Sequence, residues 1–259
     1  MGIEIDLSDR VAVVTGAGAG MGRAIAGQLG RSGANIAVLE IDAASASAAA
    51  DELQEEHGVR ALAVPCDVSD RAAVDASFAR VQDEFGRLDI AVNNAGISRI
   101  GPHTQDVTDA DWLDTVNVMQ TGVFYCMRAA GRLMLPNERG SIVNVSSIRG
   151  FSPNPGRLAY CATKAAVIMM TKVAAGEWGP LGVRVNAVAP GIQRTPMWDS
   201  DVADGTIDEP FYLNLVPAGQ IGDPNDVGRL VAYLCSDHAS YVSGSVMTID
   251  GGLTSIPAG

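Results

Sequence analysis

Short runs of β-branched residues alternate with alanine-rich helical segments along the whole chain, and this alternation limits the folds open to it. Strand, helix and strand in succession are typical of right-handed βαβ crossovers, which build a parallel sheet with helices on both faces. The pattern predicts an α/β fold with a doubly wound, seven-stranded parallel sheet. We expect strands at residues 11–15, 35–39, 61–64, 88–92, 141–145, 183–188 and 245–249, and helices at 21–32, 43–57, 71–85, 109–135, 159–178 and 224–235.

The composition indicates one self-contained domain with no nucleic-acid or membrane partner. The 259 residues are 47% apolar and 19% charged, which supplies ample core material, and α/β folds of this length are often one domain. The formal net charge of −12 predicts repulsion from nucleic acids and anionic membranes. The most apolar helical stretch, around residues 165–175, is interrupted by Lys172 and is shorter than the roughly 20 residues of a membrane span.

The distribution of cysteines and the first residues predict a cytoplasmic protein. The start of the chain carries no export or myristoylation signal. Four cysteines lie far apart and form no CxxC pair, so we expect reduced thiols: Cys66, Cys126, Cys161 and Cys235. Three histidines are scattered without metal-ligand spacing, so we expect no metal: His57, His103 and His238.

The long stretch at residues 191–223 has no predicted strand or helix. Loops of this length in compact domains are usually lids or disordered segments. Trp198, Phe211 and Tyr212 favour a substrate-binding lid, because such aromatic residues are unusual in a solvated linker. The alternative is that they only pack a short helix.

A glycine-rich turn follows the first predicted strand, with the pattern T-G-x-x-x-G-x-G on Thr15, Gly16, Gly20 and Gly22. It is not the G-x-G-x-x-G form, because Met21 stands where the third glycine would be. Glycines let the backbone approach a pyrophosphate, and the N-terminus of the following helix offers N–H groups. The turn predicts a dinucleotide site, with tight packing of strand on helix as the alternative.

Residues at the ends of the next strands extend this site. Glu40 ends the second strand, where a carboxylate bonds the adenosine ribose hydroxyls and repels a 2′-phosphate, which favours NAD over NADP. The alternative for Glu40 is a solvated strand-end carboxylate. We expect the adenine edge and the crevice at the strand ends to be lined by Asp67, Val68, Asn94, Ala95 and Gly96.

Tyr160 and Lys164 are four residues apart and share one face of a predicted helix. A nearby ammonium favours the phenolate and lowers a tyrosine pKa from about 10. The pair therefore predicts an acid–base catalyst. The spacing is informative because Lys164 and Lys172 are the only lysines in the chain.

In order along the sequence, these motifs resemble those of the short-chain dehydrogenase/reductase family, over nearly the whole chain. The matching residues are the glycine turn, Asp67, N-N-A-G at 93–96, Asn117, Ser147, Tyr160 with Lys164, P-G at 190–191 with Thr195, and D-G-G at 250–252. The resemblance implies one Rossmann domain over residues 1–259. It also implies that Met21, Ile192 and Thr195 help to hold the cofactor.

The resemblance assigns roles to four side chains. Tyr160 would exchange a proton with the substrate oxygen, to which Ser147 would hydrogen-bond. Lys164 would bind the nicotinamide ribose and tune Tyr160, and Asn117 would hold a water that links Lys164 to solvent. Ser146 is the rival of Ser147, and a helix cap or a buried helix hydrogen bond is the alternative for Ser147 and Asn117.

The reaction so implied is hydride transfer between NAD and an alcohol or ketone, without a metal. Apolar and aromatic loop residues favour a hydrophobic, cyclic secondary alcohol. The candidate substrate residues are Ser98, Arg149, Arg157, Trp198 and Phe211. The arginines are able to recognise a carboxylate, and for Arg157 the alternative is a solvated or lid-pairing side chain.

Two other functions stay open at this point. A 3-oxoacyl thioester reductase of fatty-acid synthesis usually takes NADPH and docks an acidic carrier protein, and both Glu40 and the net charge of −12 count against it. A non-catalytic NAD-binding regulator tends to lose the tyrosine–lysine pair. Family members are commonly tetramers, and helices 109–135 and 159–178 are apolar over more than one sheet can cover, so we expect a homotetramer.

Overall fold

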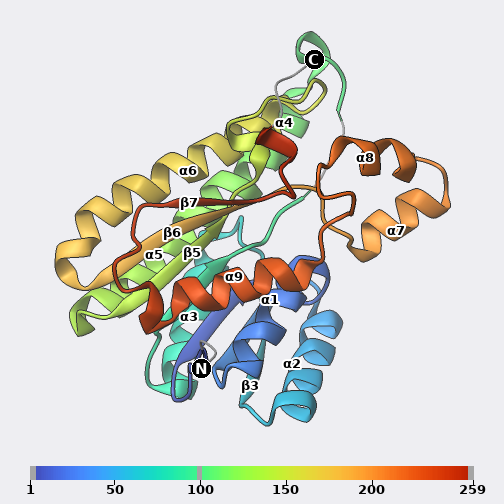
Figure 1. Cartoon of the computed structure of the whole chain (residues 1–259). Coiled ribbons are helices and arrows are strands. Elements are labelled where there is room, and N and C mark those ends of the chain that lie inside the picture. Colours follow the sequence, from blue (N-terminus) through green and yellow to red (C-terminus); the bar gives the residue numbers. More distant parts are fainter. Residues whose placement is uncertain (1–3, 98–100, 256–259) are drawn as a thin grey trace.

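The computed structural model describes residues 4–97 and 101–255, and a single seven-stranded sheet runs through its centre (Figure 1). The strand order is β3-β2-β1-β4-β5-β6-β7, and each neighbouring pair is parallel. The predicted fold class is confirmed. The strands are β1 (Val11–Thr15), β2 (Asn35–Glu40), β3 (Ala61–Pro65), β4 (Ile90–Asn93), β5 (Gly140–Val145), β6 (Val183–Pro190) and β7 (Val246–Ile249).

Helices cover the sheet on both faces. One layer holds α1 (Gly20–Arg31), α2 (Ala43–His57) and α9 (Pro224–Cys235), and the other holds α3 (Arg71–Phe85), α5 (Gly122–Met134) and α6 (Leu158–Trp178). Successive strand residues serve opposite layers, since Ala12 and Val14 pack in the first core and Val11 and Val13 in the second. Burial on both faces explains why the strand sequences are continuously apolar.

The first helix begins differently from the next two. The side chain of Asp42 caps α2 and that of Asp70 caps α3, whereas α1 begins after Ala19, which has no side-chain acceptor. The N–H groups in the first turn of α1 are therefore available to another acceptor. This turn lies between β1 and β4, where the strand order reverses and where open α/β sheets bind ligands.

The prediction of one regular helix over 109–135 is wrong. The segment consists of α4 (Asp109–Val116), a π-helical turn η2 (Asn117–Thr121) and α5. A π turn takes in one more residue than an α turn, so it changes which side chains face the sheet. Gly122 then lets α5 approach the loop after β3 closely, because a Cβ there would lie 3.0 Å from Cγ2 of Val68.

The segment 191–223 is ordered into two short helices, α7 (Pro196–Ala203) and α8 (Glu209–Leu215), which project from the sheet in Figure 1. Thr195 caps α7 and Asp208 caps α8, each with a proline in the first turn. Arg194 pairs with Asp199 at 2.8 Å and also with Glu209, and so joins the two helices. We call residues 191–223 the lid segment.

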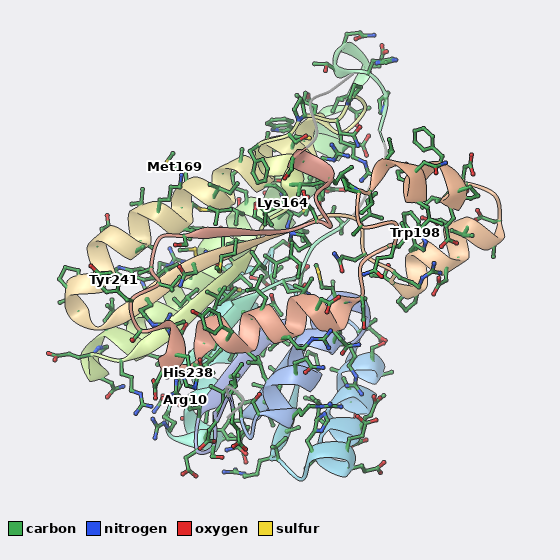
Figure 2. The ribbon with its side chains drawn as sticks, viewed as in Figure 1. Arg10, Lys164, Met169, Trp198, His238 and Tyr241 are labelled. Atoms are coloured by element: carbon green, nitrogen blue, oxygen red, sulfur yellow. The ribbon has the colours of Figure 1, made fainter. Side chains whose placement is uncertain are left out.

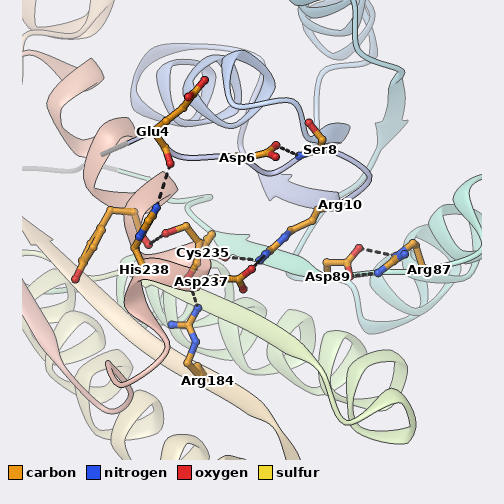
Figure 3. A network of polar contacts seen from close by, with 12 residues as sticks. Glu4, Asp6, Ser8, Arg10, Arg87, Asp89, Arg184, Cys235, Asp237 and His238 are labelled. Carbon is orange, nitrogen blue, oxygen red and sulfur yellow. Dashed lines mark hydrogen bonds and ion pairs between the residues drawn. The ribbon is translucent and has the colours of Figure 1, made fainter. Parts of the chain in front are cut away.

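A network of polar contacts fastens the amino ends of the strands, at the opposite end of β1 from the glycine turn (Figure 3). Arg10 donates to the carbonyl of Cys235 at 2.9 Å and pairs with Asp237 at 2.7 Å, and this pairing lowers the pKa of Asp237. Nε2 of His238 lies 3.1 Å from the carbonyl oxygen of Glu4. His238 therefore has a structural contact that ties the start of the chain to the region after α9.

Short 3-10 turns complete the described chain: η1 (Thr104–Asp106), η3 (Leu135–Asn137), η4 (Ile148–Gly150), η5 (Gly179–Leu181), η6 (Asp237–Ala239) and η7 (Leu253–Ser255). By length and mean hydropathy, the stretch Leu158–Leu181 would be able to cross a membrane. In the fold this stretch is α6 with η5; it packs on β6 and buries Lys164, so it forms part of the helical layer.

Candidate active site

A cavity of about 470 Å³ opens along the carboxyl ends of the central strands. Glu40, Ile41 and Asp67, which end or follow β2 and β3, line one part of it. Tyr160 and Lys164 of α6 line the part beside β5. The glycine turn lies between them, so the cavity joins the sequence motifs expected to hold a dinucleotide.

Asn94 holds the glycine turn in shape. The hydroxyl of Thr15 accepts hydrogen bonds from the N–H groups of Asn94 and Ala95, both at 3.0 Å. The amide of Asn94 donates to the carbonyls of Thr15 at 3.0 Å and Gly16 at 3.2 Å. The end of β4 thus fixes the end of β1 through four contacts.

The glycines of the turn serve two purposes. A Cβ on Gly22 would lie 2.0 Å from the carbonyl oxygen of Gly16, so this glycine allows close packing, as the alternative interpretation holds. Gly20 has a φ of +55° and lines the cavity, and the nearest atom to a Cβ there would be 3.8 Å away on Thr195. The space before the uncapped start of α1 is therefore lined by backbone, which suits a pyrophosphate.

Glu40 is fixed against the glycine turn. One carboxylate oxygen accepts from the N–H of Gly18 at 3.1 Å, and the other accepts from the N–H of Ile41 at 2.8 Å. A Cβ on Gly18 would lie 2.8 Å from Cγ of Glu40, so Gly18 is a site residue that we did not assign from the sequence. Its signal was present as a further glycine within the turn.

The other strand-end residues also reach the cavity. Asp67 accepts hydrogen bonds from the N–H and hydroxyl of Ser69, at 2.9 and 2.7 Å, which orients its carboxylate. Of the remaining predicted cofactor residues, those lining the cavity are Gly16, Met21, Val68, Ala95, Gly96 and Thr195. Ile192 is not among them in the described part of the chain, and its carbonyl accepts from the N–H of Gly222 at 3.0 Å.

Ser147 and Tyr160 come together as the sequence resemblance implied. The two side chains share a hydrogen bond, and the hydroxyl of Ser147 also accepts from the N–H of Arg149 at 3.1 Å, which caps η4. Ser146 lines the larger cavity, which Ser147 does not, but the hydroxyl of Ser146 donates to the carbonyl of Lys164 at 2.9 Å. Of the two serines, Ser147 contacts Tyr160 and Ser146 anchors α6.

The expected lowering of the Tyr160 pKa by Lys164 is wrong for this structure. Burial raises the pKa of Tyr160, while the hydrogen bond with Ser147 and the charges of Arg157 and Arg149 act in the opposite direction. The ammonium of Lys164 donates instead to the carbonyl of Val145 at 2.7 Å. Burial also lowers the pKa of Lys164 to about 8.

The role expected for Asn117, which is to hold a water between Lys164 and solvent, stays a prediction. Asn117 is exposed at the start of η2 and, within the described chain, does not line the cavity. Met119, two residues later in the same turn, is 2% exposed and lines the cavity together with Lys164.

A second cavity of about 150 Å³ adjoins Tyr160, and one of the predicted substrate residues lines it. Arg157 lines it, with its guanidinium carbon 5.8 Å from the centroid of the Tyr160 ring. Its lining also includes the polar side chains of Asp111 and Thr115 and the apolar residues Ile97, Pro102, Val107, Leu158 and Ala159. This cavity is the structural candidate for the substrate site.

The other predicted substrate residues lie elsewhere. Trp198 is 8% exposed and packs edge-on against Tyr212 within the lid segment, with the ring centroids 5.4 Å apart (Figure 2). Phe211 is 55% exposed. In the described part of the chain neither lines either cavity. Arg149 donates to the carbonyl of Pro153 at 3.2 Å, and Ser98 lies outside the described residues.

Comparisons with known proteins agree with this geometry. A family model described as Enoyl-(Acyl carrier protein) reductase matches residues 16–254. The chain is 38% identical over 246 residues to (2S)-[(R)-hydroxy(phenyl)methyl]succinyl-CoA dehydrogenase subunit BbsD of Thauera aromatica, covering 95% of this chain and 97% of that one. It is 36% identical over 251 residues to 3-oxoacyl-[acyl-carrier-protein] reductase FabG of Aquifex aeolicus, covering 97% and 100%.

Solved structures show the same fold with either nicotinamide dinucleotide. NAD+-bound xylitol dehydrogenase superposes with a TM-score of 0.90 at 31% identity, over 95% of this chain and 99% of that one. A protein of Agrobacterium tumefaciens with bound NADP superposes with a TM-score of 0.89 at 32% identity, over 98% and 100%. The chain belongs to the short-chain dehydrogenase/reductase family, and it is an oxidoreductase that uses a nicotinamide cofactor.

Proposed function

We propose that the protein is an NAD-dependent oxidoreductase that interconverts a hydrophobic secondary alcohol and its ketone. The observation that carries the proposal is one cavity that joins Glu40, held at the glycine turn, to Tyr160 and Lys164. When bound, the nicotinamide supplies the hydride acceptor or donor. The other requirements, which are binding, orientation and proton transfer, fall to the residues of this chain.

The cavity suits a dinucleotide along its length. Glu40 and Asp67 offer carboxylates for the adenosine end, and the backbone at Gly20 with the uncapped start of α1 suits the pyrophosphate. Lys164 would hold the nicotinamide ribose. Within the described residues that line this cavity, Lys164 is the one cation.

The position of that cation favours NAD over NADP. Glu40 ends β2, which is three strand positions from β5. Lys164 lies at β5, because its ammonium donates a hydrogen bond to the carbonyl of Val145. A 2′-phosphate would therefore meet the carboxylate of Glu40 and the apolar side chain of Ile41, with no cation of the cavity wall beside it. An uncompensated carboxylate facing a phosphate costs at least about 1.4 kcal/mol, or tenfold in kcat/KM.

Tyr160 and Ser147 carry the proton chemistry in this proposal. Tyr160 exchanges a proton with the substrate oxygen, and the hydroxyl of Ser147 donates a hydrogen bond to the same oxygen. The positive charges of Arg157 and Arg149 favour the phenolate, which is the form that accepts a proton from an alcohol. The substrate carbon skeleton would occupy the adjoining cavity lined by Ile97, Val107 and Leu158.

The second candidate is a 3-oxoacyl thioester reductase. It is supported by the similarity to FabG of Aquifex aeolicus and by the description of the matching family model. Glu40 and the net charge of −12 oppose it, because such enzymes usually take NADPH and dock an acidic carrier. A non-catalytic regulator is opposed by the intact, hydrogen-bonded pair of Tyr160 and Ser147.

The test is a panel of secondary alcohols with NAD or NADP, followed by absorbance of the reduced nicotinamide. We expect kcat/KM to be at least about tenfold higher with NAD for a cyclic, hydrophobic alcohol. Glu40→Ser combined with Ile41→Arg should narrow or invert that ratio. Equal use of NADP by the native protein would refute the cofactor assignment, and faster reduction of acetoacetyl thioesters with NADPH would favour the second candidate.

We also propose that the enzyme is a cytoplasmic homotetramer. The cysteines Cys66, Cys126, Cys161 and Cys235 are free thiols in the described structure, which suits a reducing compartment. Exposed apolar side chains on α5 and α6 support the oligomer, among them Phe124, Met169 and Val173.

A further inference from the structure

Among the described residues that line the cavity of about 470 Å³, one carries an amine. Lys164 is 4% exposed and lines the cavity together with Tyr160. Its Nζ donates a hydrogen bond to the carbonyl of Val145 at 2.7 Å, and this bond ties the end of the side chain to β5. The nitrogen is therefore fixed in position beside an open space.

Few polar groups compete for this nitrogen. An ammonium has three N–H donors, and within the described structure the carbonyl of Val145 is the one acceptor bonded to Nζ. The carboxylates that line the cavity belong to Glu40 and Asp67, which end β2 and follow β3. These strands are three and four positions from β5, which corresponds to about 14 and 19 Å at the usual strand spacing. No carboxylate of the described cavity wall therefore holds Lys164 in its charged form.

Burial changes the protonation of this amine. It lowers the pKa of Lys164 to about 8, because the charged form loses its solvation. At pH 7.5 about a quarter of the molecules then carry a neutral amine, compared with about one in a thousand for an ordinary lysine of pKa about 10.4. A neutral amine has a free electron pair, and lysines made neutral by desolvation are nucleophiles toward carbonyl compounds.

The space around the amine suits a small hydrophobic compound. An apolar cavity of about 150 Å³ is enough to bind benzene, and this cavity is about three times larger. The ring of Tyr160, with its centroid 5.7 Å from Nζ, provides a phenol able to relay protons near the nitrogen. A carbonyl compound with one six-membered ring therefore has room beside Lys164. The apolar residues of the cavity wall include Met21, Ile97, Val118, Met119 and Val145.

We propose that Lys164 of the cofactor-free protein is a covalent modification site for small hydrophobic aldehydes and ketones. The electron pair of Nζ attacks the carbonyl carbon and forms a C–N bond. Both protons of the neutral amine then pass to the carbonyl oxygen, the C–O bond breaks, and the departure of water leaves an imine. The step needs no oxidant or reductant, and hydrolysis reverses it.

The modification has a consequence for the proposed function, and this consequence alone rests on that function. The ketone formed from a secondary alcohol belongs to the class of compounds that form such an imine. The free protein would then be inhibited by its own product. NAD in the same cavity would protect Lys164, so the inhibition should disappear at saturating NAD.

The test is reductive labelling of the native protein without cofactor. Cyclohexanecarboxaldehyde is the probe, and cyanoborohydride reduces the imine at each modified lysine to a stable secondary amine. Lys164 and Lys172 are the only lysines in the chain, and Lys172 is exposed on the same helix, so it serves as the internal control. By peptide mass spectrometry at pH 7.5, we expect Lys164 to be labelled at least about tenfold faster than Lys172.

Two variants identify the labelled nitrogen. Lys164→Arg should lose the fast label, because a guanidinium does not form the imine, and Lys172→Arg should keep it. Labelling of Lys172 as fast as that of Lys164 in the native protein would overturn the modification site. This last comparison does not depend on the folding of any variant.

Saturating NAD separates the modification from the proposed function. It should slow the labelling of Lys164 by about tenfold or more and leave that of Lys172 unchanged. Selective labelling that NAD does not slow would support the modification site but contradict the placement of NAD in this cavity. Equal labelling of both lysines in a protein that turns over NAD would overturn the modification site and leave the function standing.

Discussion

At the residue scale, the pKa of Tyr160 is set by burial, by a hydrogen bond with Ser147 and by two arginine charges, all of which act on its hydroxyl group. Tyr160→Phe keeps the ring and deletes the transferable proton. We expect kcat to fall by about 10² or more while NAD affinity changes little. Steady-state kinetics and a fluorescence titration with NAD check this, and retained turnover would move the acid–base role to another residue.

Lys164 is a buried charge, and replacing it should stabilise the fold while it damages function. Since burial lowers its pKa from 10.5 to about 8, the charged form is disfavoured in the folded state. Lys164→Met should weaken NAD binding and kcat but raise the free energy of unfolding at pH 7 by about 1–3 kcal/mol.

The size of this stability effect depends on pH. Below pH 8 Lys164 is protonated in both the folded and the unfolded native protein, so the stability gained by Lys164→Met is at its maximum. Between about pH 8 and 10.5 this gain decreases, because folded Lys164 is then neutral and burying it no longer costs free energy. Denaturant melts at pH 7 and pH 10 check the trend. A gain that grows with pH would contradict the assignment of a buried, charged Lys164.

Arg157 should tune the acidity of Tyr160. Its positive charge is the larger of the two arginine contributions that lower the pKa of the phenol. Arg157→Gln should therefore raise this pKa. The pH range over which kcat for alcohol oxidation increases should then move to higher pH. Arg157→Lys keeps the charge and is the matched control. If the pH profile of kcat is the same in the native protein and in both variants, Arg157 has no part in the proton chemistry.

At the scale of elements, the lid segment depends on a single cation. Arg194 joins α7 to α8 through Asp199 and Glu209. The ring of Trp198 on α7 also packs on that of Tyr212 on α8. Arg194→Met should loosen the two helices and raise the KM for NAD by about tenfold or less, with little change in global melting temperature.

The control for the lid is a similar ion pair on another helix. Arg229 pairs with Asp226 on α9 and is also about half exposed. Arg229→Met should leave the KM for NAD unchanged. If both variants raise KM equally, the effect comes from lost surface charge and not from the lid.

The elements that were predictable from the sequence are those with a strong local signal. Strands such as β1 and β5 are rich in β-branched residues, and α2 and α3 start after the caps Asp42 and Asp70 and end at glycines. The lid helices are only 8 and 7 residues long, which is too short for hydrophobic periodicity to show. Their caps, Thr195 and Asp208, were the available signals.

The site residues divide in a similar way. Tyr160 and Glu40 were predictable because their positions follow from helix spacing and from the end of a strand, whereas Ser147 and Asn117 were assigned through the family resemblance. The π turn that begins at Asn117 was not predictable, because such a turn among ordinary helix-forming residues leaves no trace in the pattern. Trp198 was misplaced because an aromatic residue in a loop indicates burial, but not whether a substrate or Tyr212 buries it.

At the scale of the whole molecule, α5 and α6 present an apolar surface that one subunit leaves uncovered. Phe124, Met169 and Val173 are 45%, 59% and 51% exposed, and Met169 points away from the sheet in Figure 2. Exposed apolar faces of this kind are typical of subunit contacts. We expect light scattering at micromolar concentration to give a mass near four times 26.8 kDa.

Charge insertion tests which surface holds the oligomer. Met169→Glu should dissociate it and lower activity, because the same helix carries Tyr160. Ala48→Glu, on the exposed side of α2, is the matched control and should keep the native mass. A native mass of 26.8 kDa, or equal effects of the two variants, would show that α6 is not an interface.

The strand order also has a consequence for the growing chain on the ribosome. β1 lies between β2 and β4, so its second edge is covered only after residues 90–93 have been made. At about 5–20 residues per second, the newly made β1-β2-β3 sheet keeps an uncovered central edge for several seconds. Val13 and Val14 on that edge have no charge to discourage pairing with another nascent chain. Slower translation before β4 should therefore lower the yield of native protein more than the same delay after β5.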